Sequence, residues 1–310
     1  MAITCIYHGK CADGFAAAWA VKQALGDDIE FVPGIYGADP PDVAGRDVIM
    51  VDFSYKRPVL GAMVRQARSI LILDHHKTAQ ADLTGFPGPL ASRDLGPWDS
   101  HIRQVRSGLA GRNTSTPSVL FDMDRSGAQL AWDFFHPGKP RPALIDYVAD
   151  RDLWWFVLPQ SREVSAWIAS YPFAFADWDF LAAELDRDMG VLRAANDGRA
   201  ILRSRDKELA DLLEVVQRPM VIGGHRVPVA NLPFSMASDA AGKLAEGQPF
   251  GTTYFDRPDT RVFSLRSRDG GIDVSEIAAA YGGGGHRNAA GFQVPLGWEG
   301  DDRSLLTGSK

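Results

Sequence analysis

Four short clusters of histidine, aspartate and cysteine carry the residue types and spacing that suit metal chemistry in this sequence of 310 residues. The clusters are residues 8–14 (His-Gly-Lys-Cys-Ala-Asp-Gly), 52–54 (Asp-Phe-Ser), 74–76 (Asp-His-His) and 150–152 (Asp-Arg-Asp). Carboxylates that are packed closely together repel one another, and bound cations are the simplest way to neutralise them. A mixture of imidazole nitrogen and carboxylate oxygen suits Mn²⁺, Fe²⁺, Co²⁺ or Zn²⁺ better than Ca²⁺, which prefers oxygen ligands alone.

The candidate ligands are numerous enough for two ions. Two divalent ions that share a carboxylate and a bridging water generate hydroxide near neutral pH and stabilise an in-line displacement at phosphorus. The clusters therefore predict hydrolysis of phosphoesters. A single histidine or aspartate after a strand is usually a turn or cap residue, so the prediction depends on the four clusters lying together.

These clusters can meet only if the elements that carry them belong to one sheet. Short β-branched apolar runs predict strands at residues 3–7, 47–51 and 69–73, and helical patterns at 15–25 and 58–67 separate them. This alternation is typical of βαβ units, whose strands bring their carboxyl ends to one crevice. We expect an α/β fold in which helices cover both faces of an N-terminal, mostly parallel sheet.

The remainder of the chain predicts a linker helix and a smaller C-terminal α/β domain. Residues 84–117 are rich in Gly, Pro and Ser and predict a long surface excursion. Residues 192–216 mix charges with a Leu/Ile stripe and predict a long connecting helix that ends at a boundary at 217–219. The expected domains are 1–190 (metal-binding), 191–217 (linker helix) and 218–310 (substrate-binding). Further strands are expected at 118–121, 227–230, 251–255 and 261–265, and further helices from 126, at 143–149, within 161–190, at 238–244 and at 274–281.

A glycine-rich segment of the C-terminal domain, residues 282–292, has features that are typical of an anion-binding turn. Consecutive glycines allow backbone N–H groups to converge, and neighbouring His and Arg side chains add positive charge. The segment lacks the Gly-Lys-Ser/Thr ending of a P-loop. An arginine of the preceding strand could supply a further phosphate contact, although exposed arginines are more often solvated surface. The predicted substrate-binding residues are Arg266, Gly283, Gly284, Gly285, His286 and Arg287.

The composition limits the setting and the partners. A formal net charge of −6 argues against a protein that coats long nucleic acid through a wide basic surface, but it leaves short nucleotides open. Two cysteines, Cys5 and Cys11, are too few for a disulfide framework and favour a reducing compartment. The sequence shows neither a secretory signal pattern nor an apolar run long enough to span a membrane, so we expect a cytoplasmic protein with no membrane partner.

The sequence resembles the DHH phosphoesterase superfamily, which is named for the motif that stands here at residues 74–76. Residues 8–14, 51–53 and 149–152 resemble its first, second and fourth motifs. Residues 282–292 resemble the glycine-rich signature of the DHH-associated C-terminal domain. The resemblance covers nearly the whole chain, and the pattern is most similar to oligoribonuclease-like members.

The resemblance implies a set of metal ligands. His8 would hold the first Mn²⁺ and Asp13 the second, with Asp52 bridging the two. His75 and Asp150 would complete the second site. The C-terminal domain would close over the crevice and grip a phosphate or sugar away from the reacting one.

The resemblance also implies that His76 lies near the scissile phosphate as a charge stabiliser or proton donor, and that Asp74 orients a neighbouring histidine. At one candidate ligand position the chain departs from the family pattern, because many members carry Asp where this chain has Cys11. A thiolate can bind a transition metal once its pKa is lowered, whereas a free cysteine is more often a small buried residue. In the fourth motif Asp152 competes with Asp150 as the ligand, and the position of Asp150 after the apolar helix favours Asp150.

These observations predict a cytoplasmic, Mn²⁺-dependent phosphodiesterase that hydrolyses short single-stranded RNA or DNA in the manner of an oligoribonuclease or exonuclease. Mg²⁺, Co²⁺ and Fe²⁺ are the other candidate ions. An enzymatic alternative is a phosphatase or phosphodiesterase that acts on small nucleotides such as phosphoadenosine phosphate or cyclic or linear dinucleotides. An alternative of another class is a nucleotide- or metal-binding module without catalysis, which the Cys11 substitution makes conceivable.

Overall fold

The computed structural model describes residues 2–86, 117–268 and 270–301. The chain divides into two compact units, Met1–Leu202 and Arg203–Lys310, and each unit has its own sheet and its own apolar core. Most of the predicted surface excursion lies outside the described residues, as do the last residues of the chain.

The sheet of the first unit is parallel at every pair of described strands. The strands lie in the order β2-β1-β3-β4-β5. Strands of a parallel sheet are buried on both faces, which explains why the sequence shows them as short continuous apolar runs. They are β1 (Ile3–His8), β2 (Ile29–Gly34), β3 (Asp47–Val51), β4 (Ser69–Asp74) and β5 (Ser118–Phe121).

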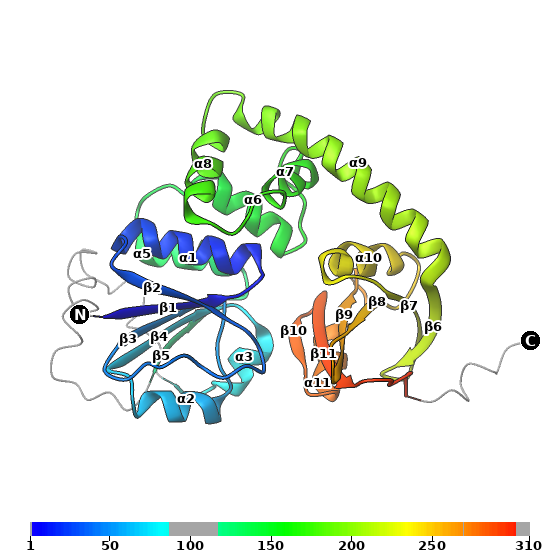
Figure 1. Cartoon of the computed structure of the whole chain (residues 1–310), viewed down its shortest axis with the longest axis horizontal. Coiled ribbons are helices and arrows are strands. Elements are labelled where there is room, and N and C mark those ends of the chain that lie inside the picture. Colours follow the sequence, from blue (N-terminus) through cyan, green and yellow to red (C-terminus); the bar gives the residue numbers. More distant parts are fainter. Residues whose placement is uncertain (1, 87–116, 269, 302–310) are drawn as a thin grey trace, which may run out of the picture. The chain divides into compact units, whose positions relative to one another are not determined.

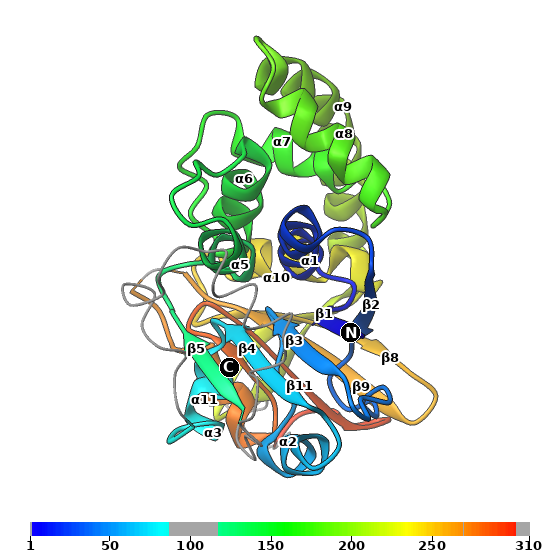
Figure 2. The same ribbon diagram turned by 90° about the vertical axis from the view of Figure 1, so that its left-hand side faces the viewer.

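Two separate apolar clusters cover the two faces of this sheet. Because side chains alternate along a strand, Cys5 joins the cluster on one face and Ile6 the cluster on the other. Helices α1 (Ala12–Leu25) and α5 (Gly127–Phe135) lie on the first face, and α2 (Arg57–Val64) lies on the second, as Figure 1 and Figure 2 show. The prediction of helices on both faces is confirmed.

Further helices enlarge the cluster on the α1 side of the sheet. They add aromatic residues to it, including Trp167 and Trp178. The short helix α3 (Lys77–Asp82) follows β4 directly. The other helices are α6 (Ala143–Asp152), α7 (Ser161–Ile168), α8 (Phe175–Leu185) and the long α9 (Gly190–Val216), within which the division between the two units falls.

The second unit is a mixed sheet with helices packed against it. Its strands lie in the order β10-β11-β9-β8-β7-β6, in which β7 and β8 are parallel and the other neighbours are antiparallel. Helix α11 contributes to the cluster around Phe263 and Phe292, whereas α10 and the end of α9 form a second cluster. The elements are β6 (Gln217–Ile222), β7 (His225–Asn231), the 3-10 helix η1 (Phe234–Met236), α10 (Ala237–Leu244), β8 (Gly251–Asp256), β9 (Thr260–Arg266), α11 (Val274–Ala280), β10 (Gly284–His286) and β11 (Ala289–Pro295).

The observed architecture confirms the predicted α/β class, and it adds strands that the sequence patterns do not predict. Both β2 and β6 are edge strands that contain a proline, Pro33 and Pro219, and an edge position tolerates proline because one side of the strand needs no ladder hydrogen bonds. Residues 217–219, which the sequence predicts as a domain boundary, are the first residues of β6. Within the described ranges, no helix combines the length and the apolar character that a bilayer crossing needs.

Candidate metal centre

Three parallel strands deliver polar residues to one edge of the first sheet. Strand β1 ends at His8, β3 is followed by Asp52, and β4 ends at Asp74. The carboxyl ends of parallel strands lie on the same side of the sheet, so these side chains gather there. Asp52 has a left-handed backbone with φ of 54°, and Asp is one of the non-glycine residue types enriched in that conformation.

The Asp52 carboxylate lies at the centre of the cluster. Its Oδ1 lies 3.0 Å from Nε2 of His75, and its Oδ2 lies 3.3 Å from Nδ1 of His8. The same Oδ1 lies 3.9 Å from Nδ1 of His76. Asp52 is buried, and its Oδ2 accepts no well-formed hydrogen bond from the described part of the chain. This oxygen therefore has coordination capacity that the protein itself does not use.

Asp13 reaches the cluster from the first turn of α1, and the start of α5 holds it there. Its Oδ2 accepts a hydrogen bond of 2.6 Å from the Gly127 N–H, and its Oδ1 accepts one of 3.1 Å from the Ala128 N–H. These N–H groups belong to the first turn of α5, where a helix leaves its donors unpaired and favours negative charge. Asp13 Oδ2 also lies 3.5 Å from Nε2 of His75.

The approach of α5 to the cluster requires glycine at position 127. A Cβ atom on Gly127 would lie 2.4 Å from the Cβ of Asp52 and 2.8 Å from Oδ2 of Asp13. Carbon atoms do not approach so closely, so a larger residue would displace one of the two aspartates. A capping box formed by Ser126 and Gln129 fixes the start of the helix at this position.

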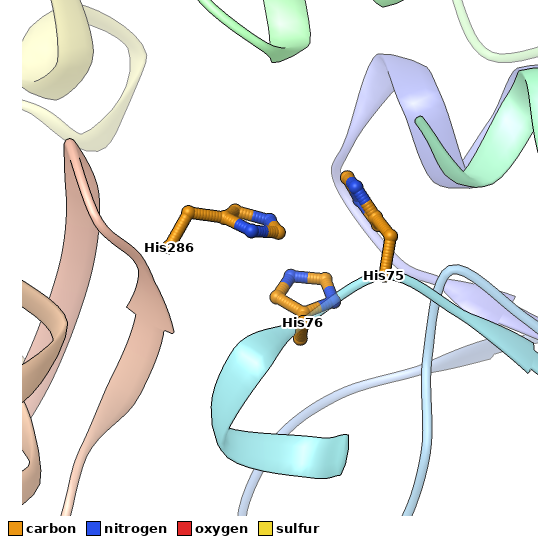
Figure 3. Close-up of side chains that lie close together, drawn as sticks. All are labelled: His75, His76 and His286. Carbon is orange, nitrogen blue, oxygen red and sulfur yellow. The ribbon is translucent and has the colours of Figure 1, made fainter. Parts of the chain in front are cut away.

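Asp74 positions the two histidines that follow it. Its Oδ1 accepts hydrogen bonds from the backbone N–H groups of His75 and His76, at 2.8 and 3.2 Å, and lies 2.7 Å from Nδ1 of His76. Figure 3 shows the two imidazoles, which leave the chain between β4 and α3. Because a carboxylate only accepts hydrogen bonds, Nδ1 of His76 is the donor, and this contact sets the tautomer and the orientation of the ring.

The last turn of α6 brings Asp152, rather than Asp150, to the cluster. Asp152 Oδ2 lies 3.6 Å from Nε2 of His75 and accepts no hydrogen bond from the described residues. The Asp150 carboxylate instead accepts hydrogen bonds from the backbone N–H groups of Val157 and Leu158, at 3.0 and 3.3 Å. The Asp150 oxygens are thus used by the chain that follows α6, and we propose Asp152, which lies beside His75, as the ligand in place of the predicted Asp150.

Cys11 precedes α1 as its N-cap residue and lies beside His8. Burial raises the pKa of the Cys11 thiol, and a hydrogen bond with His8 opposes that increase. Among the described residues, Cys11 belongs to none of the groups whose ligand atoms are close enough to share an ion. The other cysteine, Cys5, is fully buried in the sheet.

The carboxylates of the cluster are crowded enough to perturb one another. Burial, followed by the charges of Asp152 and Asp52, raises the pKa of Asp13 well above its usual value, and burial raises the pKa of Asp152. Burial alone would raise the pKa of Asp52, but the neighbouring imidazoles of His75 and His8 lower it. Burial would lower the pKa of His75, whereas its contact with Asp52 and the nearby carboxylates raise that pKa to about 10.

The arrangement of ligand atoms fits two divalent cations. His8, Asp52 and His76 form one group, and Asp13, Asp52 and His75 form another, with the ligand atoms of each group within 4.8 Å of one another. Asp52 belongs to both groups. The mixture of imidazole nitrogen and carboxylate oxygen is a donor set that suits Mn²⁺, Fe²⁺, Co²⁺ and Zn²⁺.

Tyr36 borders the same cluster and is absent from the residues predicted from the sequence. Its ring centroid lies 5.3 Å from that of His8, 6.3 Å from that of His76 and 4.8 Å from that of Phe53, and the residue is 42% exposed. Tyr36 follows β2, which is parallel to β1 and ends at the same edge. The sequence pattern of β2 is the apolar pair Phe-Val at positions 31–32. This pair is followed by a proline and a glycine and is too short to predict a strand.

The predicted substrate-binding arginines lie in the second unit and are held by acceptors of that unit. The Nη2 of Arg266 donates a hydrogen bond of 2.6 Å to Oγ of Ser238, and its Nη1 donates one of 2.8 Å to the Leu265 carbonyl. The Nη2 of Arg287 donates a hydrogen bond of 3.0 Å to the Gly271 carbonyl. Each guanidinium group thus has a hydrogen-bond acceptor within the second unit that favours one orientation.

The glycine-rich segment forms a β-hairpin rather than an open turn. Residues 284–286 form β10, which pairs in antiparallel fashion with β11. The N–H of Gly283 donates to the Ala278 carbonyl at 2.9 Å, so it completes the end of α11. A Cβ atom on Gly285 would lie 2.5 Å from the Ala289 carbonyl oxygen. The Gly283 N–H is thus used within the second unit, and close approach of the two strands explains the glycine at 285.

The second unit has a counterpart among known protein families. Residues 230–303 match the family model of the DHHA1 domain. The second unit therefore contains a DHHA1 domain. This match confirms the expectation of a DHH-associated C-terminal domain, which the glycine-rich segment indicates. The Asp-His-His motif at residues 74–76 lies in the first unit, outside the matched range.

The whole chain is similar to a curated viral protein and to several solved structures. It is 28% identical over 311 residues to uncharacterized protein R106 of Acanthamoeba polyphaga mimivirus, which covers 93% of this chain, and the chain spans 66% of that relative's length. A pGpG-specific phosphodiesterase, PggH of Vibrio cholerae, aligns with a TM-score of 0.43 at 13% identity and covers 96% of this chain and 94% of its own. RecJ of Thermus thermophilus in complex with Mn²⁺ aligns with a TM-score of 0.45 at 15% identity and covers 98% of this chain and 50% of its own.

Proposed function

We propose that this protein is a divalent-metal-dependent phosphodiesterase that hydrolyses short oligonucleotides in the manner of an oligoribonuclease or exonuclease. The observation that carries the proposal is the Asp52 carboxylate, which is shared by two groups of candidate ligands. Two metal sites around one carboxylate are the arrangement by which a pair of ions clamps a phosphoester. The DHHA1 match of the second unit supports the same assignment.

The proposed ion is Mn²⁺, with Mg²⁺, Co²⁺ and Fe²⁺ as alternatives, because the donor set is mixed. His8 and Asp52 would hold one ion. The other would be held by Asp13, Asp52, His75 and Asp152. When bound, such ions lower the pKa of a water molecule and stabilise the negative charge that develops on the phosphoryl oxygens.

The side chains of the cluster would orient the phosphate and exclude bulk water. Asp74 holds the His76 ring through Nδ1 at 2.7 Å, in a fixed position beside Asp52. From this position His76 would donate a hydrogen bond or a proton to an oxygen of the reacting phosphate. Three of the candidate ligands are buried, namely Asp13, Asp52 and His75. Solvent therefore screens their interaction with a charged ion only weakly.

The second unit would hold the nucleotide at a point away from the reacting phosphate. Arg266 and Arg287 have guanidinium groups that are oriented by hydrogen bonds, and His286 is the last residue of β10. Fixed guanidinium groups suit phosphate recognition because they lose little freedom on binding. The formal net charge of −6 disfavours a long nucleic acid, which supports a short substrate.

A substrate panel in Mn²⁺ tests this proposal. The panel contains RNA and DNA of a few nucleotides, cyclic and linear dinucleotides, and phosphoadenosine phosphate, each with and without EDTA. We expect the fastest hydrolysis for the short oligonucleotides and none in EDTA. Faster hydrolysis of phosphoadenosine phosphate or of a dinucleotide would identify an enzyme of small nucleotides instead. Binding of two ions without hydrolysis of any compound would overturn the catalytic assignment in favour of a binding module.

A further inference from the structure

The chain that follows α6 forms a short loop, and hydrogen bonds to Asp150 stabilise this loop. The backbone carbonyl of Asp150 accepts hydrogen bonds from the N–H groups of Trp155 and Phe156, at 2.9 and 3.3 Å. Its carboxylate accepts those of Val157 and Leu158. One buried residue thus organises four consecutive backbone donors. We call residues 154–156, which read Trp-Trp-Phe, the aromatic loop.

The backbone of the aromatic loop is strained. Trp154 has a φ of 62° and Phe156 a φ of 53°. Bulky side chains rarely adopt this left-handed conformation, because the Cβ atom approaches the following carbonyl oxygen. Strain of this kind persists where the surrounding structure enforces it, and it occurs most often at binding and active sites. The hydrogen bonds of Asp150 are the enforcing structure here.

Guanidinium groups accompany the rings of the aromatic loop. The Cζ of Arg151 lies 4.4 Å from the ring centroid of Trp154 and 5.5 Å from that of Phe156. The Cζ of Arg162, in α7, lies 3.8 Å from the ring centroid of Phe156. Arginine stacked on aromatic rings combines a flat surface for a base with positive charge for a phosphate, as in proteins that bind single-stranded nucleic acid.

Trp155 is the ring of the loop that remains open to solvent. It is 50% exposed, and no ring or cation contact ties its indole to another described residue. Three positions earlier in the chain, Asp152 places its carboxylate 3.6 Å from His75 in the metal centre. Only two residues separate Asp152 from Trp155, so the indole cannot lie far from the metal centre.

We propose that the aromatic loop is a nucleobase-binding site in which Trp155 stacks on the base of a nucleotide whose phosphate is at the metal centre, with Arg151 and Arg162 facing the backbone of the substrate. The proposal rests on the proposed function, since it assigns the base-recognition site of the same centre. Stacking on an indole is tolerant of base identity, because every base has a flat π face. The loop would therefore select nucleotides over other phosphoesters without selecting a sequence.

Kinetics of a Trp155→Ala variant test the proposal. On short RNA with Mn²⁺, we expect KM to rise by about 5- to 100-fold, the range that loss of one stacked base produces, with kcat little changed. On the same RNA with an abasic residue at the cleaved end, the variant and the wild type should be equal. Trp155→Phe should restore most of the affinity, because a smaller ring still stacks. Phe180→Ala, which removes a ring that is 47% exposed on α8, is the matched control and should behave as the wild type. Equal KM values for Trp155→Ala and wild type on normal RNA, or an equal loss on the abasic RNA, would overturn the proposal.

A binding measurement without metal separates this proposal from the proposed function. Calorimetric titration of AMP and of ribose 5-phosphate in EDTA compares ligands that differ only in the base. We expect AMP to bind more tightly than ribose 5-phosphate to the wild type, and the difference to disappear in Trp155→Ala. If the protein hydrolyses nothing but shows this difference, the proposed function fails and the stacking site stands. If hydrolysis of short RNA is found and Trp155→Ala leaves both measurements unchanged, the stacking site fails and the proposed function stands.

Discussion

Asp150 and Asp152 both lie in the last turn of α6, yet their carboxylates have different partners. Asp152 Oδ2 lies 3.6 Å from Nε2 of His75, whereas the oxygens of Asp150 accept hydrogen bonds from the backbone of Val157 and Leu158. One carboxylate therefore lies in the candidate metal centre, and the other binds the loop that follows α6. Two positions along a helix correspond to a rotation of about 200°, which is enough to send the side chains in different directions.

Substitution of these two aspartates should separate stability from metal binding. Asp150→Ala removes the acceptor of the Val157 and Leu158 N–H groups and should lower the free energy of unfolding by about 0.5–1.5 kcal/mol per lost hydrogen bond. Asp152→Asn removes one of several crowded charges, so the metal-free protein should unfold at an unchanged or higher temperature. Its Mn²⁺ affinity should fall by at least the roughly 10- to 100-fold that loss of an outer partner of a metal ligand costs. Thermal unfolding measures the change in stability, and calorimetry measures the change in Mn²⁺ affinity. Loss of Mn²⁺ affinity in Asp150→Ala but not in Asp152→Asn would identify Asp150 as the ligand.

Asp52→Asn should remove metal binding without unfolding the protein. Asn has nearly the same size and also tolerates the left-handed backbone of position 52, so the turn after β3 should persist. The charge that both ligand groups share is lost, and hydrolysis should fall on the order of 10³-fold, equivalent to several kcal/mol of transition-state stabilisation. Titration with Mn²⁺ should show two sites in the wild type and none of comparable affinity in the variant. Asp197→Asn, at an exposed position of α9, is the control. Near-normal hydrolysis by Asp52→Asn would refute the mechanism.

Asp74→Asn should lower the rate without changing the number of bound ions. The Asn oxygen can still accept the N–H groups of His75 and His76, but it no longer carries the charge that faces Nδ1 of His76. We expect kcat to fall by about 10- to 100-fold, as for other partners that orient a catalytic or ligating histidine. Steady-state kinetics and the Mn²⁺ stoichiometry of the same sample check this prediction. Loss of an ion instead of rate would show that Asp74 itself is a ligand.

Gly127→Ala should disturb the metal centre from a helix that supplies no ligand. Its added Cβ would lie 2.4 Å from the Cβ of Asp52, so the aspartate or α5 must move. We expect a loss of about 1–3 kcal/mol in the free energy of unfolding, typical of overpacking, and weaker Mn²⁺ binding. The matched control is Gly61→Ala in α2, where a Cβ meets no atom within 4 Å. That change should raise stability by up to about 1 kcal/mol, because alanine favours a helix more than glycine does. Equal effects of the two substitutions would contradict the steric argument.

Asp133 should make the stability of the first unit depend on pH. Burial alone would raise the pKa of Asp133, but hydrogen bonds from Arg141 and Arg125 lower it. A carboxylate whose pKa is lower in the folded state stabilises the fold above its unfolded pKa of about 3.9, and this contribution is lost as the pH falls through the folded pKa. The difference in unfolding free energy between wild type and Asp133→Asn should therefore be constant above about pH 5 and shrink below about pH 4. Denaturant titrations at several pH values measure it, and a difference that grows in acid would have the wrong sign.

The pattern of local residues is sufficient to predict much of this protein. Strands β1, β3 and β4 are continuous apolar runs, and a polar cluster follows each of them directly. Because parallel strands share one carboxyl edge, the gathering of His8, Asp52 and His75 follows from the order of elements alone. Strand β2 escapes prediction because its edge position imposes less apolar character, and Tyr36 is overlooked with it.

The sequence by itself determined the α/β class, the candidate metal-ligating residue types and the edge of the sheet at which they lie, since strand pattern and chain direction are local properties. Only the tertiary structure decided which carboxylate lies beside His75, because Asp150 and Asp152 differ in their through-space partners and not in their local pattern. It likewise decided that the Gly283 N–H is used by α11 and that Gly127 must be small. Each of these facts depends on a contact between segments far apart in the chain or on a hydrogen bond that a single-residue pattern does not encode.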